Sequence, residues 1–161
     1  MDKNILFGLN RSDFRSPAHF GTDARRLEAS GWDFLFIPCS PLLIKDPYVM
    51  LAEALRQTST IGLGTLIENP VMRNPAVIAS SIATIEDLDP GRITLGIGVG
   101  DTAVRLMGQK PATVKQLQEA TIAIQSLLDG DELDTTSARP AKLRHSNNSS
   151  GRPPIWIATQ G

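Results

Sequence analysis

Strand-like apolar runs recur along this chain at a nearly constant distance. They begin 28, 28 and 32 residues apart, at Ile5, Asp33, Ile61 and Ile93. Each interval has room for one helix. Antiparallel strands can be joined by a two-residue hairpin, whereas parallel strands need a crossover of about a dozen or more residues. The spacing therefore predicts an α/β fold with a parallel sheet.

Capping residues and prolines indicate where the helices lie. A short helix is expected over residues 22–30. Asp46-Pro47 and Asn74-Pro75 each place a capping side chain before a proline, a pattern typical of a helix start. Pro111 is expected to open a last helix, which Gly130 ends.

The remaining segments give one loop and one more strand. Residues 131–153 are polar and lack apolar periodicity, so we expect a loop there. A fifth strand follows in the run PPIWIATQG. About five parallel strands and four helices fit either an open doubly wound sheet or part of a (β/α)8 barrel. A complete barrel needs roughly 250 residues, so a barrel of 161 residues is a fragment or is completed by another copy.

Composition excludes several classes of partner. The 16 basic and 17 acidic residues give a net charge of −1, which provides no basic surface for nucleic acid or an anionic membrane. The N-terminus lacks the long apolar run of a signal peptide or membrane span. A single cysteine, Cys39, cannot form an internal disulfide. We expect a cytoplasmic protein.

Glycine-rich segments follow the third and fourth strands. The run Gly98-Val99-Gly100-Asp101-Thr102-Ala103 matches the dinucleotide fingerprint G-x-G-x-x-G/A. The ribose-binding acid expected about 20 residues later falls at Glu119, inside the last helix, which disfavours a nicotinamide site. The glycines alternatively serve close packing at a strand end. In the third strand, Gly62 and Gly64 leave space above the sheet. Residues 66–70 pass from apolar to polar and form a shelf on which a flat ring fits.

These segments resemble a known family. The stretch GLGTLIENPVMRNPAVIASSIATIEDLDPGRITLGIGVGD, with PPIWIATQG, is similar to the luciferase-like flavin- and deazaflavin-dependent oxidoreductases, and most similar to the methylenetetrahydromethanopterin reductase branch. The resemblance implies an α/β fold that is a partial (β/α)8 TIM barrel, with residues 1–161 as a single domain truncated after Gly161. It also implies hydride transfer between coenzyme F420 or FMN and a small organic substrate. The alternative is a non-catalytic half-barrel or a binding subunit.

The resemblance also assigns residues to the cofactor. Leu66-Ile67 occupies the place of a non-prolyl cis peptide that supports the ring, with Glu68 and Asn69 continuing the shelf; the alternative is an ordinary trans strand end. Gly98, Gly100 and Asp101 border the ring, and Asp101 is alternatively a helix cap. Thr159 and Gly161 match the start of a segment that contributes to the site for the phosphate-bearing tail.

The chain departs from the family after its second strand. Many deazaflavin enzymes carry Ser-Asp-His there, whereas this chain has Pro38-Cys39-Ser40. Cys39 and Ser40 are the catalytic candidates at this position, together with Asp101, although Cys39 is alternatively a small buried apolar residue. His19 and His145 have no partners at ligand spacing, so we assign no metal. Unpaired sheet edges lead us to expect a homo-oligomer or a partner that completes the barrel.

Overall fold

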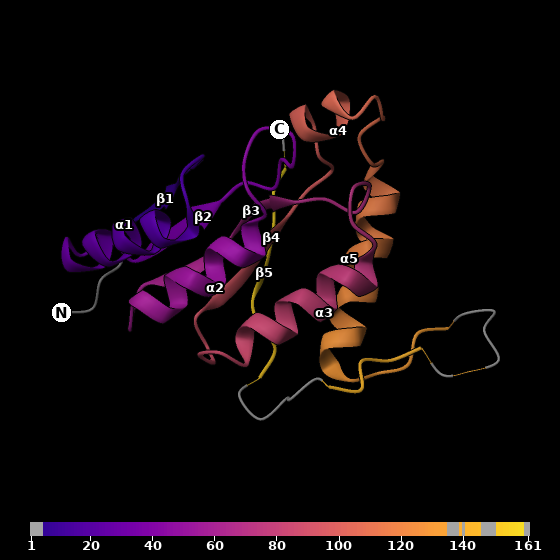
Figure 1. The fold of residues 1–161 in the computed structure, drawn as a ribbon. Helices are drawn as coiled ribbons and strands as arrows, with labels where there is room; N and C mark the ends of the chain where they lie inside the picture. Colours follow the sequence, from indigo (N-terminus) through magenta and orange to yellow (C-terminus); the bar gives the residue numbers. More distant parts are fainter. Residues whose placement is uncertain (1–4, 135–138, 140, 146–150, 160–161) are drawn as a thin grey trace.

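A computed structural model describes residues 5–134, 139, 141–145 and 151–159. Strands and helices alternate along the chain, with one short helix added after the fourth strand (Figure 1). The elements are β1 (Gly8–Asn10), α1 (Pro17–Ala29), β2 (Phe34–Ile37), α2 (Pro47–Gln57), β3 (Gly62–Glu68), α3 (Pro75–Glu86), β4 (Ile93–Ile97), α4 (Thr102–Leu106), α5 (Val114–Asp129) and β5 (Ile155–Ile157).

The sheet settles which of the two predicted architectures is present. Its five strands lie in the order β1-β2-β3-β4-β5, and every neighbouring pair is parallel. A doubly wound sheet reverses its strand order at a switch point, and this sheet does not. Right-handed crossovers between successive parallel strands place the connecting helices α1, α2, α3 and α5 on one face, as in a barrel. Within the described residues the sheet remains open, with β1 and β5 at its edges.

Side-chain caps begin the helices where the sequence predicts them. Asp46 accepts hydrogen bonds from the backbone N–H groups of Tyr48 (3.0 Å) and Val49 (3.2 Å). Asn74 likewise caps α3 through the N–H of Ala76 at 2.9 Å. Each cap satisfies donors that have no partner within the helix. Gly130 ends α5 with φ of 81°, the left-handed conformation that glycine adopts without penalty.

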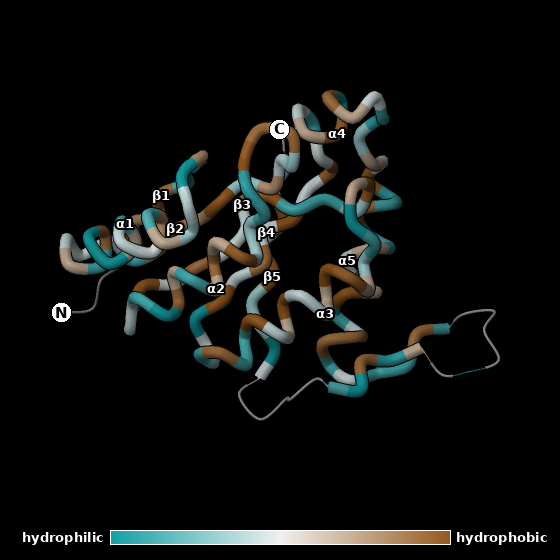
Figure 2. The backbone as a smooth tube through the Cα atoms, viewed as in Figure 1, coloured by the Kyte–Doolittle hydropathy of each residue, from teal (hydrophilic) through white to brown (hydrophobic). Residues whose placement is uncertain are grey.

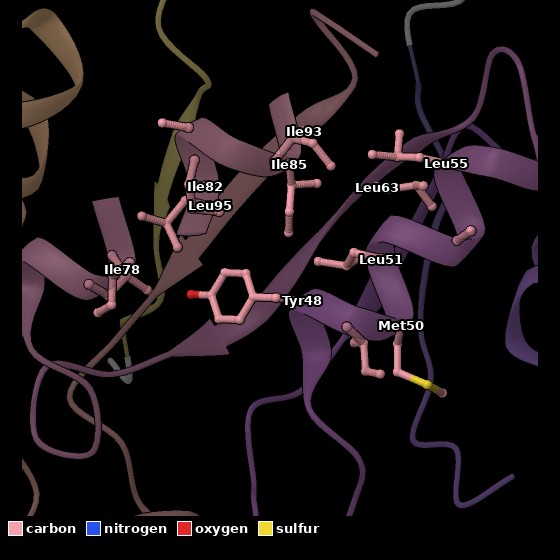
Figure 3. Close-up of a cluster of buried hydrophobic side chains, with 14 of the residues drawn as sticks. Tyr48, Met50, Leu51, Leu55, Leu63, Ile78, Ile82, Ile85, Ile93 and Leu95 are labelled. Atoms are coloured by element: carbon pink, nitrogen blue, oxygen red, sulfur yellow. The ribbon is translucent and has the colours of Figure 1, made fainter. Parts of the chain in front are cut away.

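The main core lies between the sheet and the helices α2 and α3. Figure 3 shows side chains of both helices directed toward those of β3 and β4, and Figure 2 shows apolar and polar stretches alternating along these helices. Burial of such apolar side chains supplies most of the driving force for folding. The fully buried members include Met50, Leu51, Leu63, Ile78, Ile82, Ile93 and Leu95.

Aromatic rings occupy the opposite face of the sheet. Phe34 and Phe36 of β2 stack with centroids 5.6 Å apart, and Trp156 of β5 contacts both, with centroids at 5.3 Å. Strands β3 and β4 lie between β2 and β5, so the rings reach across two strands. Gly62 and Gly64 make this possible, because a Cβ at either position would meet the Phe34 or Phe36 ring. The sheet is therefore curved around an aromatic cluster.

Several sequence predictions are corrected by the structure. The first strand was expected to begin at Ile5, yet β1 spans Gly8–Asn10. Ile5, Leu6 and Phe7 precede it and are exposed, because β1 is an edge strand with one neighbour. Helix α5 begins after the cap Thr113 rather than at Pro111.

The number and extent of the helices also differ from the prediction. Four helices were expected, and the described residues contain five, because the glycine-rich loop after β4 leads into α4. Helix α1 starts at Pro17, five residues earlier than expected, where Ser16 caps it. The segment 131–153 includes an antiparallel bridge between Leu133 and Ala141, and Leu133 packs on the core.

We predict that Glu28 stabilises the turn before β3. One of its carboxylate oxygens accepts hydrogen bonds from the N–H groups of Ser59 (2.8 Å), Thr60 (2.6 Å) and Ile61 (3.0 Å). Burial alone raises the pKa of Glu28, but these backbone donors outweigh it and lower the pKa from 4.5 to about 2. A lowered carboxyl pKa stabilises the fold above pH 4.5, and the contribution disappears as the pH falls toward 2.

Urea denaturation of Glu28→Gln measures this contribution. The free energy of unfolding should fall by about 1–3 kcal/mol at pH 7, and the difference from the parent protein should shrink between pH 4.5 and pH 2. Glu119→Gln on the exposed side of α5 is the control, with an expected change within about 0.5 kcal/mol. Equal effects of the two substitutions would contradict the assignment.

Candidate functional site

An irregularity in β3 forms the floor of the candidate site. The peptide bond between Leu66 and Ile67 is cis, as the family resemblance implies. The register against β4 shifts between Thr65 and Glu68, so β3 bulges at this point. Strand β4 approaches closely here, because a Cβ on Gly96 would lie 2.2 Å from the carbonyl oxygen of Thr65.

Neighbouring elements hold the bulge on both sides. From β1, the Asn10 side-chain amide donates to the carbonyl oxygen of Leu66 at 3.0 Å. The Asn69 side chain accepts from the N–H of Met72 at 3.0 Å. Gly100 packs against Asn69. Its φ is 76°, and a Cβ at this position would lie 3.1 Å from the Asn69 side chain. The last residue of β1 and residues that follow β3 and β4 thus fix one surface.

This surface lines a cavity of about 310 Å³ at the carboxyl ends of the strands. Parallel α/β proteins bind ligands at this end, where the loops converge. Figure 1 shows the loops after β3 and β4, with α4, near this end of the sheet. The lining residues come from four successive strand ends and are Ser12, Pro38, Cys39, Ser40, Leu43, Ile44, Leu66, Ile67, Asn69, Gly100, Asp101, Thr102 and Ala103.

Most of the site residues expected from the sequence meet in this cavity. Leu66 and Ile67 lie on one side, and the segments after β2 and β4 face them. The expected residues that line the cavity are Cys39, Ser40, Leu66, Ile67, Asn69, Gly100 and Asp101.

Glu68 was expected to continue the shelf beneath the ring, but it does not line this cavity. Its side chain is buried and accepts hydrogen bonds from the Tyr48 hydroxyl on α2 and from the Asn69 N–H, both at 2.9 Å. The Arg73 guanidinium lies 3.5 Å away. Burial raises the pKa of Glu68, and these donors and the nearby cation oppose the rise. Glu68 therefore supports the bulge from behind.

Gly98 and the C-terminal segment were also expected to contact the cofactor, but neither Gly98 nor Thr159 lines the cavity. A Cβ on Gly98 would lie 2.4 Å from the Cδ1 of Ile67, so Gly98 makes room for Ile67. Thr159 is exposed and is not among the residues that line the cavity. Gly161 lies outside the described residues.

The two residues after Pro38 have contrasting environments. The Cys39 side chain is buried, and burial, followed by the charge of Glu68, raises the pKa of its thiol. A protonated thiol is a poor nucleophile, so Cys39 behaves here as a small apolar residue. The Ser40 hydroxyl is buried and has no hydrogen-bond partner among the described residues. It is the group at this position that is available to a ligand.

Asp101 takes the helix-cap position without capping the helix. It precedes α4, but its side chain accepts no capping hydrogen bond and instead pairs with Arg105 one turn later. The carboxylate is largely exposed at the mouth of the cavity, so it can accept a hydrogen bond from a ligand.

Several residues of the site were missed from the sequence. Ser12 lines the cavity and Asn10 holds the bulge, and both follow or end β1. Their position after a strand was a usable signal, because every strand end of a barrel contributes to the same face. The contact of Tyr48 with Glu68 depends on how α2 packs, so local sequence carried no signal for it. Arg73 reaches Glu68 from the segment between β3 and α3.

The fold is that of a parallel α/β protein with a cavity at the strand ends. The chain belongs to the luciferase-like monooxygenase family, whose model matches residues 9–161. It is 33% identical over 142 residues to 5,10-methylenetetrahydromethanopterin reductase of Archaeoglobus fulgidus, covering 83% of this chain and 41% of that protein. It is 31% identical over 123 residues to the F420-dependent hydroxymycolic acid dehydrogenase of Mycobacterium tuberculosis, covering 71% and 34%.

Solved structures show the same fold. The coenzyme F420-dependent tetrahydromethanopterin reductase of Methanopyrus kandleri superposes with a TM-score of 0.80 at 22% identity, covering 99% of this chain and 51% of that one. A type II Baeyer-Villiger monooxygenase of Pseudomonas putida in complex with FMN gives 0.73 at 20% identity, covering 94% and 51%. The chain thus has part of a (β/α)8 barrel, and its matches span 41% and 34% of the two curated relatives named above. None of the described helices is long and apolar enough to cross a bilayer.

We predict that Tyr48→Phe weakens the support behind the bulge. The substitution removes a 2.9 Å hydrogen bond to the buried Glu68 carboxylate with little change in shape. Leaving a buried acceptor with one donor fewer should lower the free energy of unfolding by about 1–3 kcal/mol, measured by urea denaturation at pH 7. Tyr48→Leu, which also removes the ring, separates the contribution of packing from that of the hydrogen bond. Phe20→Tyr is not a suitable comparison because it adds a buried hydroxyl. An unchanged stability of Tyr48→Phe would show that Glu68 does not need this donor.

Proposed function

We propose that this chain provides the cofactor-binding part of an oxidoreductase that transfers hydride between coenzyme F420 or FMN and a small organic substrate. The observation that carries the proposal is the cavity at the strand ends, floored by the bulge at Leu66-Ile67 and lined from four strand ends. The F420-dependent relatives and the FMN complex of a structural neighbour support the same class of cofactor.

The residues present fit a planar ring. The cavity of about 310 Å³ lies at the lower end of the range for ligand sites, which run from about 300 to 1,000 Å³. Leu66 and Ile67 provide an apolar surface, and the Ser40 hydroxyl is a buried group that lacks a partner among the described residues. A polar ring edge would satisfy that hydroxyl, since buried polar groups are nearly always hydrogen-bonded.

Each residue has a distinct proposed role. Leu66 and Ile67 support one face of the ring, and Gly98 allows Ile67 to lie flat. Asn69 and Gly100 border its edge. Thr159 and Gly161 are proposed to reach the phosphate-bearing tail. The bound cofactor supplies the hydride chemistry, while the protein orients the ring and excludes water from one face.

Ser40 and Asp101 are the groups proposed to face the substrate. Ser40 stands where many deazaflavin relatives carry His, and a hydroxyl is a weak general base. Asp101 is held beside Arg105 and can accept a hydrogen bond from a substrate hydroxyl. We therefore propose that these residues orient the substrate and that the reaction does not depend on a His base at this position.

Titration with the two cofactors tests the proposal. Coenzyme F420 and FMN are added separately to the purified chain, and ring fluorescence is followed. We expect a saturable change with at least one of them at tens of micromolar or below. No change with either cofactor would contradict the proposed function.

A substitution at Gly98 tests where the ring binds. In Gly98→Val the new side chain must displace Ile67, because even a Cβ would lie 2.4 Å from Cδ1 of that residue. We expect cofactor affinity to fall at least tenfold. Ala29→Val is the control, at an exposed position on α1 outside the cavity, and it should retain binding. Unchanged affinity in Gly98→Val would refute the placement of the ring.

The exposed sheet edges favour a second proposal, that further strands complete the barrel. Strands β1 and β5 each have one neighbour in the sheet. Apolar side chains lie exposed near both edges: Ile5, Leu6 and Phe7 before β1, and Trp156 and Ile157 in β5, with Trp156 43% exposed. Unpaired edges with apolar side chains favour association with other strands. The proposed completion comes from further residues of the same protein, another copy or a partner protein.

Sedimentation of the isolated 161-residue chain checks this second proposal. We expect self-association or aggregation that rises with protein concentration. Trp156→Lys should reduce the association, whereas Val114→Lys, at a more exposed apolar position on α5, should leave it unchanged. A monomer that unfolds cooperatively would contradict the proposal.

A further inference from the structure

A second and larger cavity lies beside the proposed cofactor cavity. It has a volume of about 870 Å³ and lies between the loop after β2 and the segment that leads from β3 into α3. The two cavities share the wall formed by Cys39, Ser40, Leu43 and Ile44. Only the smaller one is lined by Leu66 and Ile67, so the larger cavity adjoins the proposed ring position without including it.

Apolar side chains surround this second cavity. Phe14 follows β1, Leu42 and Leu43 lie on the loop after β2, and Val77 is in the first turn of α3. All four are exposed, with Phe14 71% exposed and Val77 47%. Large apolar side chains gathered around one concave surface indicate a binding site rather than scattered surface residues.

Four charged side chains line the cavity, and their formal charges sum to zero: Lys45, Asp46, Glu68 and Arg73. Arg73 lies with its guanidinium 4.7 Å from the centre of the Tyr48 ring and pairs with Asp46 at 2.9 Å and Glu68 at 3.5 Å. Lys45 also lines the cavity, and within the described part of the chain no carboxylate pairs with it. Because Arg73 is already paired with acids, Lys45 is the cation available to a ligand.

The loop that carries Phe14 is held in place before any ligand binds. Asp13 is buried and accepts from Arg15 through its backbone N–H (2.8 Å) and its guanidinium (2.7 Å). Arg11 and Arg15 also pair with Asp23 of α1. The Arg15 hydrogen bonds lower the pKa of both acids, so they remain charged at neutral pH. A loop fixed by these ion pairs loses little conformational freedom when a ligand binds.

We infer that this cavity binds a small molecule with an unbranched apolar chain and one anionic end, such as a medium-chain carboxylate. The apolar chain lies against Leu42, Leu43 and Val77, and the anionic end meets Lys45. A volume of about 870 Å³ is within the usual range for small-molecule sites. The inference stands apart from the proposed function, because none of it requires a bound cofactor.

Titration with three eight-carbon probes tests the charge requirement. Octanoate, octanol and octylamine are added to the 161-residue chain without cofactor, and binding is followed by ligand-observed NMR. Octanoate should bind tightest and octylamine weakest. Equal binding of the three probes, tighter binding of octylamine or no binding of octanoate would overturn the inference.

A chain-length series tests the apolar part of the cavity. Burial of one methylene contributes about 0.8 kcal/mol, so affinity should rise about fourfold per added methylene from hexanoate to octanoate. An affinity that does not depend on chain length would overturn the inference.

Matched substitutions locate the binding. Lys45→Glu should weaken octanoate roughly fivefold or more while leaving octanol unchanged, and Val77→Asn should weaken both probes. The controls are Lys110→Glu and Val114→Asn, at exposed positions outside the cavity. Circular dichroism confirms that each variant is folded, and Lys45→Gln replaces Lys45→Glu if the latter is not. Loss of octanoate binding in the controls, or its retention in both cavity variants, would overturn the inference.

Discussion

Close contact between the backbones of β3 and β4 at Gly96 shapes the candidate site. Any side chain there would meet the Thr65 carbonyl oxygen, so β4 can pass the bulge only because Gly96 lacks a Cβ. The bulge then turns Leu66 and Ile67 toward the strand ends and Glu68 toward α2. One local irregularity thus separates an apolar floor on one side from a buried polar network on the other. Both features follow from how two neighbouring strands fit together.

The contacts around the bulge explain why distant parts of the chain belong to one site. Asn10 reaches it from β1, Tyr48 supports Glu68 from α2, and Gly100 fits against Asn69 from the loop after β4. Each contact is modest, since a hydrogen bond contributes about 1 kcal/mol net. Together they hold a surface in place before a ligand arrives, which reduces the entropy lost on binding. The ion pairs around Asp13 do the same for the loop that lines the second cavity.

The sequence predicts the repeating part of the fold better than its edges and side-chain networks. Helix starts at Asp46 and Asn74 were predictable because a cap and a proline act within one turn. The cavity-lining residues after β2, β3 and β4 were predictable because parallel strands end on one face. The exposure of Ile5 to Phe7 was not predictable, since an apolar run has the same sequence pattern at the edge and in the centre of a sheet. Nor was the orientation of Glu68, which depends on the bulge and on α2.

The central claim is that a planar cofactor ring lies on Leu66-Ile67 in the cavity at the strand ends. Amide NMR of the ¹⁵N-labelled chain, recorded while FMN or coenzyme F420 is added, tests it most directly. The account predicts that the amide signals of Ile67, Asn69, Gly100 and Asp101 shift together and saturate at one ligand concentration, while signals of Gln57 and Gly130 at the far ends of their helices stay fixed. Shifts confined to other surfaces, or none at the bulge, would contradict it.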